Sequence, residues 1–108
     1  MVALTKTISE SIDNWVNYDP DYKDLILWYL ESEKETIASL YDALENKDYN
    51  RINYLADMVY GHGGSFGFMM ISYLGRAIGF AVKNKDDAEI SVLISKLGDY
   101  VNLLSAQQ

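Results

Sequence analysis

The segment spanning residues 56–68 contains the side chains that are best suited, by type and spacing, to catalysis or ligand binding. It contains a carboxylate at Asp57, the chain's single histidine at His62, and four glycines between positions 61 and 67. With one histidine and no cysteine, Cys/His dyads, thiolate metal sites and histidine-rich metal sites are excluded. The segment also lacks the lysine and the preceding strand of a phosphate-binding P-loop. We therefore expect no metal, no cofactor and no enzymatic centre of these kinds.

The glycines of this segment need an explanation, because the residues before them have helical spacing. A glycine inside a helix costs about 1 kcal/mol relative to alanine. The glycines either let a neighbouring helix or a partner's backbone approach closely, or they end the helix. The residues alone leave both explanations open.

Apolar residues at helical spacing predict the elements that must position this segment. A short N-terminal helix is expected within residues 1–17, ended by the sequence before Pro20. Longer helices are expected over about 21–46, from Asp48 into the glycines, over about 68–84, and after Asp87. In the 21–46 helix, Tyr41 is expected to face inward and Glu33 to face water. The predicted core stripe of the last helix is Ile90, Leu93, Ile94, Leu97, Val101 and Leu104.

Short loops between amphipathic helices predict an antiparallel, up-down-up-down four-helix bundle over residues 21–106. The N-terminal helix would cover one end or one flank, so that residues 1–108 make one all-α domain. The apolar cluster at residues 25–30 is too broad for one stripe and is expected to meet both the core and this N-terminal helix.

Charge and hydropathy narrow the classes of partner. The net charge of −7 leaves no basic stripe for nucleic acid and disfavours anionic membrane surfaces. No apolar run approaches the roughly 20 residues of a membrane span, and the first ten residues do not resemble a signal peptide. A cytoplasmic protein is the default expectation. The acidity gives solubility or complements a basic partner.

The glycine-rich segment follows a recognisable pattern, Ala/Gly-His-x-x-Lys-Gly-Ser-x-Gly-Ser-Phe/Tyr-Gly-Phe. The positions that match in register are Ala56, Gly61, Gly64, Ser65, Phe66, Gly67 and Phe68. Residues 40–48 and 74–86 match the flanking turns, so that the likeness extends over about 21–104. On these residues the chain resembles the histidine phosphotransfer (HPt) domains of two-component phosphorelay pathways, a bacterial-type signalling system. The resemblance implies a four-helix bundle that binds a response-regulator receiver domain or a histidine kinase.

The chain departs from this family where the chemistry occurs. The family's phospho-accepting histidine falls on Asp57, its lysine falls on Tyr60, and a small residue falls on His62. On a helical wheel Asp57 lies about 150° from the centre of its apolar stripe and should face water. A solvated carboxylate is a poor phosphoryl acceptor without its own magnesium and lysine.

These departures predict a degenerate HPt-like module that docks a receiver or kinase without relaying phosphate. The expected docking residues are Tyr54, Asp57, Tyr60, Gly61 and Gly64. Tyr49, Tyr54 and Tyr60 lie near the Asp57 side of their helix and are either interface anchors or partly buried bundle tyrosines.

Two alternatives remain open. In the first, His62 is a surrogate phospho-acceptor, although it points about 140° away from Asp57 if the helix continues. In the second, the chain is a helical scaffold or homodimer, with residues 25–30 and the N-terminal helix forming the seam.

Overall fold

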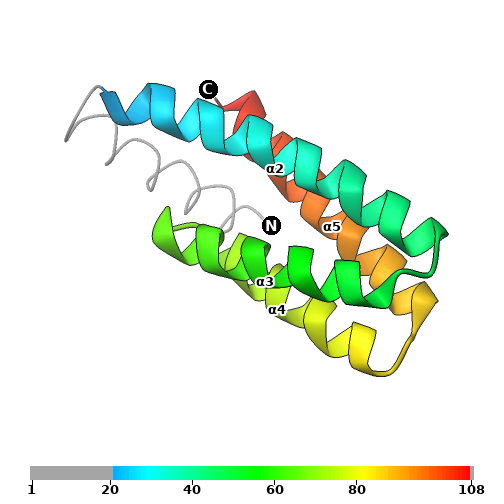
Figure 1. The fold of residues 1–108 in the computed structure, drawn as a ribbon. Helices are drawn as coiled ribbons and strands as arrows, with labels where there is room; N and C mark the ends of the chain where they lie inside the picture. Colours follow the sequence, from blue (N-terminus) through cyan, green and yellow to red (C-terminus); the bar gives the residue numbers. More distant parts are fainter. Residues whose placement is uncertain (1–20, 108) are drawn as a thin grey trace.

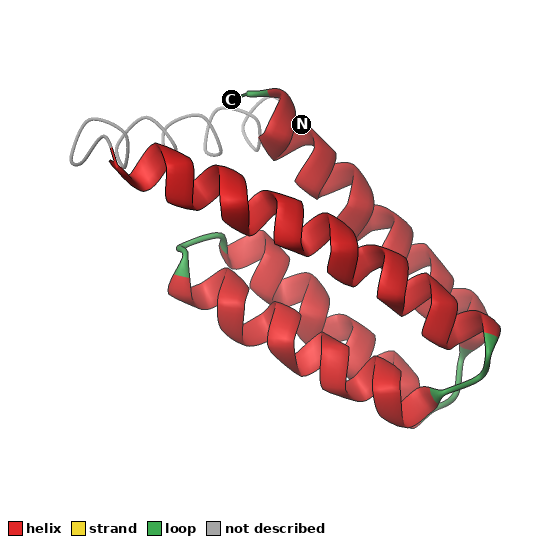
Figure 2. Cartoon of the chain, turned by 45° about the horizontal axis from the view of Figure 1, so that its top comes forward, coloured by secondary structure: helices red, strands yellow, loops and turns green. Residues whose placement is uncertain are grey.

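In the computed structural model, which describes residues 21–107, four helices form a bundle (Figure 1). They are α2 (Asp21–Glu45), α3 (Tyr49–Ser65), α4 (Met69–Lys83) and α5 (Asp87–Ala106). Successive helices run in opposite directions, and no strand occurs in the described part, as the cartoon in Figure 2 shows. The predicted all-α four-helix bundle is confirmed. The expected N-terminal helix lies outside the described residues.

Each turn between helices has three residues and the same backbone shape. The middle residue is in the left-handed region in every turn: Lys47 (φ 56°), Gly67 (φ 82°) and Lys85 (φ 49°). Two turns share the sequence Asn-Lys-Asp, and their aspartates, Asp48 and Asp86, cap the helices that follow. Each carboxylate accepts a hydrogen bond from a backbone N–H three residues on, which satisfies a donor that the first helical turn leaves unpaired. These local signals explain why the predicted ends of α2 and α4 are correct to within one residue.

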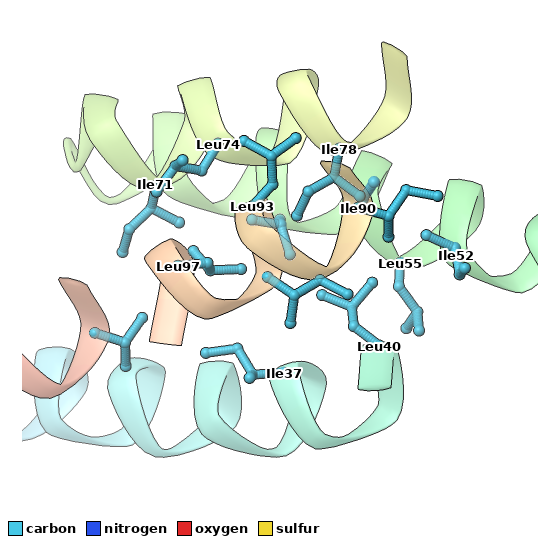
Figure 3. Close-up of a cluster of buried hydrophobic side chains, with 14 of the residues drawn as sticks. Ile37, Leu40, Ile52, Leu55, Ile71, Leu74, Ile78, Ile90, Leu93 and Leu97 are labelled. Carbon is cyan, nitrogen blue, oxygen red and sulfur yellow. The ribbon is translucent and has the colours of Figure 1, made fainter. Parts of the chain in front are cut away.

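The core lies between all four helices (Figure 3). Labelled side chains that meet there are Ile37 and Leu40 of α2, Ile52 and Leu55 of α3, Ile71, Leu74 and Ile78 of α4, and Ile90, Leu93 and Leu97 of α5. All six residues of the stripe predicted for α5 are buried, which confirms that part of the prediction. Among the described residues, no helix combines the length and the apolarity needed to cross a bilayer.

Two predictions for α2 are wrong. Glu33 is only 2% exposed, and Tyr41 is exposed. The inward stripe of α2 contains Ile26, Leu30, Glu33, Ile37 and Leu40, spaced 4, 3, 4 and 3 residues apart. Glu33 therefore occupies a core position by spacing although its side chain is charged, and Tyr41 lies one position beyond the stripe. In the apolar cluster at residues 25–30, Trp28 is exposed. The N-terminal helix that this cluster is expected to contact lies outside the described residues.

Candidate functional site

Helix α3 continues through most of the glycine-rich segment and ends at Ser65. Two glycines explain how closely α3 and α4 approach one another. A Cβ atom on Gly75 would lie 2.6 Å from the backbone nitrogen of Tyr60, and one on Gly63 would lie 2.6 Å from that of Ser72. The Ser72 hydroxyl donates a 2.8 Å hydrogen bond to the Tyr60 carbonyl oxygen. The two backbones are therefore in contact at positions where no larger residue fits.

The other glycines of the segment differ from Gly63 in their surroundings. Gly67 provides the left-handed residue of the α3–α4 turn. A Cβ on Gly61 would meet nothing within 4 Å, and one on Gly64 would meet only the Ser72 hydroxyl at 3.8 Å. Each of the two explanations left open by the sequence thus holds at one glycine. Gly63 allows a neighbouring helix to approach closely, and Gly67 belongs to the turn at which α3 ends. Neither explanation applies to Gly61, which lies exposed one turn after Asp57.

A shallow groove of about 250 Å³ runs between α3 and α4 beside this exposed face. Its lining residues are Asn53, Asp57 and Tyr60 of α3, and Gly75, Arg76, Gly79, Phe80 and Lys83 of α4. A Cβ on Gly79 would meet the Asn53 side chain at 3.9 Å. Because Gly75 and Gly79 carry no side chain, the groove lies open between the polar residues of the two helices.

The cations of the groove come from α4 and lie against aromatic rings. The guanidinium carbon of Arg76 is 5.1 Å from the centroid of the Tyr60 ring and 5.8 Å from that of Phe80. The Lys83 ammonium nitrogen is 5.2 Å from the Phe80 centroid. Such contacts favour a cation over a ring face. Within residues 21–107, neither Arg76 nor Lys83 forms an ion pair with a carboxylate.

Asp57 is exposed, at the position expected from the helical wheel, and it lines the groove. It forms no ion pair within the described part of the chain. The groove therefore carries a carboxylate on its α3 side and two cations on its α4 side, with no salt bridge between them.

His62 is exposed but does not line the groove. Because α3 is still helical at this point, the His62 side chain projects about 140° away from that of Asp57. Its carbonyl oxygen accepts a hydrogen bond from the Phe66 backbone N–H. The structure thus places the two candidate acceptors on different sides of one helix.

The three tyrosines expected near Asp57 have different surroundings. Tyr60 lines the groove, whereas Tyr54 is exposed and does not line it. Tyr49 is half-buried and donates a 2.7 Å hydrogen bond to the Asp87 carboxylate, which also pairs with Lys47. The hydrogen bonds from Lys47 and Tyr49 lower the pKa of Asp87. Tyr49 therefore links two helices structurally and takes no part in the groove.

The sequence prediction missed the α4 side of the groove. Arg76, Phe80 and Lys83 follow one another at intervals of four and three residues, which places them along one edge of a helix. That spacing is visible in the sequence. What the sequence does not show is the register of α4 against α3, which brings Arg76 beside Tyr60.

A second unusual polar group lies on α2. The Glu33 Oε2 and Tyr29 hydroxyl atoms are buried without a hydrogen-bond partner in the described structure. Burial raises the pKa of Glu33 to about 7. Burial, and to a lesser degree the charge of Glu33, raises the pKa of Tyr29, whose ring stacks on Phe66 at 4.2 Å.

Across residues 21–107, no group of three or more His, Asp or Glu side chains is arranged to hold a metal ion. Compared with known protein families, curated proteins and solved structures, the chain matches none.

Proposed function

We propose that this chain is an HPt-like signalling module that docks a receiver or histidine kinase domain and does not itself relay phosphate. The support comes from the four-helix bundle, the motif in residues 56–68, and the exposure of Asp57 where the family carries its phospho-acceptor. The observation that carries the proposal is Gly61. No contact within the described structure requires a glycine there, yet the position leaves room beside Asp57 for a partner's backbone.

The residues beside Asp57 argue against phosphoryl transfer through it. Phosphoryl transfer needs an in-line nucleophile and cations that neutralise the equatorial oxygens. Aspartate acceptors work where further carboxylates hold magnesium beside them, but among the described residues that line the groove Asp57 is the only carboxylate. Tyr60 supplies no charge at the position of the family's lysine. The proposed activity is therefore binding.

A titration of the chain with each receiver and histidine kinase domain of its host tests this proposal. We expect at least one domain to bind, and a Gly61→Gln substitution to weaken that binding about tenfold or more by filling the open position. Lys96→Gln on α5 is the control, since Lys96 is exposed and lies outside the groove. Absence of binding to every domain would overturn the proposal.

The second candidate is an active relay through His62, which is favoured by the exposure of its side chain. Incubation with a phosphorylated receiver, followed by a test for an acid-labile phosphoryl group, separates the two functions. Transfer that persists in a His62→Ala variant would eliminate this candidate.

A third candidate is a helical scaffold or homodimer module. Leu25, Leu27 and Trp28 are exposed on α2 and would supply an apolar seam. A solution mass equal to that of the monomer at micromolar concentration would count against it.

A further inference from the structure

The groove between α3 and α4 holds opposite charges that do not pair with each other. Asp57 projects from one helix, and Arg76 and Lys83 from the other, yet no ion pair of the described structure joins them. We propose that this groove is a dipolar binding site. It takes a segment of a partner protein that presents an acidic side chain to Arg76 and a basic side chain to Asp57. This inference rests on the proposed docking function and specifies the chemistry of the partner.

The surroundings of Arg76 orient its guanidinium group for binding a carboxylate. Its guanidinium lies near both the Tyr60 and the Phe80 rings, and such contacts restrict the orientation of the planar group. A guanidinium with its edge accessible binds a carboxylate through two parallel hydrogen bonds. Lys83, near the same Phe80 ring, adds a second positive charge at this side of the groove. Because the chain's net charge of −7 disfavours acidic ligands overall, an acidic side chain bound in this groove must be attracted by these two cations.

The two charges of the groove come from neighbouring helices, so the close packing of these helices guides the choice of partner segment. Packed helices usually lie 8–10 Å apart, and the contact at Gly75 places α3 and α4 towards the short end of that range. In an extended segment, side chains two residues apart point to the same side and lie about 7 Å apart. The segment that we propose as the ligand is therefore extended and carries an acidic and a basic residue separated by one apolar residue.

Three blocked tripeptides test the proposal by NMR with the full chain: acetyl-Glu-Leu-Lys-amide, and the same peptide with Gln in place of Glu or in place of Lys. We expect the first to shift the backbone amide signals of Asp57, Gly75 and Gly79. We expect it to bind about two- to fivefold more tightly than either peptide that lacks one charge, the effect of one exposed ion pair. No shift of groove signals at about 10 mM peptide, or equal affinity for all three peptides, would overturn the proposal.

Two variants assign each charge to its side of the groove. Arg76→Gln should remove the preference for Glu and keep that for Lys, and Asp57→Asn should do the reverse. The control is Lys96→Gln, which changes the net charge as Arg76→Gln does but leaves the groove intact. Preferences that stay unchanged in Arg76→Gln and Asp57→Asn would overturn the assignment, even if a receiver binds. Tripeptide binding as expected without any receiver or kinase binding would instead support the groove and remove the proposed function.

Discussion

The helix pairs α3–α4 and α2–α5 pack in different ways. At Gly63 and Gly75 the first pair meets backbone to backbone, with no space for one added methyl group. The second pair meets through side chains, and a Cβ on Gly98 of α5 would make an ordinary 3.9 Å contact with Ile37 of α2. One of the two tightest contacts among the described glycines, that at Gly75, thus lies beneath the groove, where it sets the separation of the helix backbones that carry Asp57 and Arg76. Glycine has a steric role in one pair and little in the other.

The largest expected effect is that of Gly75→Ala. The new methyl group would overlap backbone atoms of Tyr60 and Ala56, which cannot move without shifting α3. We expect the free energy of unfolding to fall by about 1–3 kcal/mol, the usual consequence of overpacking. Chemical denaturation measures this change.

Gly98→Ala is the matched control for Gly75→Ala. The same methyl group fits against Ile37, and alanine favours the helix, so the free energy of unfolding should rise by up to about 1 kcal/mol. Similar losses of stability in both variants would show that the two helix pairs do not differ as described.

A second prediction concerns the polar group buried on α2. The pKa of Glu33 rises from its ordinary value of 4.5 to about 7 in the folded chain. A raised carboxyl pKa means that its contribution to stability is fully present below about pH 4.5 and is lost as the pH rises through 7. We expect the free energy of unfolding to fall by about 1–3 kcal/mol between pH 5 and 8. A difference of one in pKa between the folded and unfolded chain corresponds to about 1.4 kcal/mol.

Glu33→Gln should remove most of this dependence on pH, because the amide does not ionise. Glu35→Gln, at an exposed position of the same helix, should retain it. Denaturation curves at several pH values compare the variants. A wild-type stability that is constant from pH 5 to 8 would contradict the burial of Glu33.

The smallest expected effect on stability is that of Gly61→Ala. Since the new methyl group meets nothing within 4 Å, only the helix preference for alanine acts, and stability should rise by up to about 1 kcal/mol. Binding to the partner domain should weaken at the same time. An increase in both stability and affinity would show that no partner backbone approaches this position.

The fold was largely predictable because its signals are local. Asp48 and Asp86 mark the beginnings of two helices, and the spacing of the apolar residues in α5 identifies its core stripe. The charge of Glu33 predicts a solvent-facing side chain, whereas its spacing between Leu30 and Ile37 places it on the inward stripe, and the spacing decides its position. Arg76 and Lys83 were missed because their position beside α3 depends on a contact between residues 60 and 75 that neither helix encodes alone. The relation to HPt domains stays a prediction.

The contact at Gly75 also limits how this groove can be re-engineered. The width of the groove is set by the packing of α3 against α4. A wider groove would require looser packing of these helices. A narrower groove is excluded, because the two backbones are already in contact. A change of ligand would therefore have to come from substitutions of the exposed lining residues, with the helix packing left unchanged. Substitutions at Arg76 and Asp57 would thus change the charge of the groove without disturbing the helix packing, whereas a substitution at Gly75 would change the packing itself.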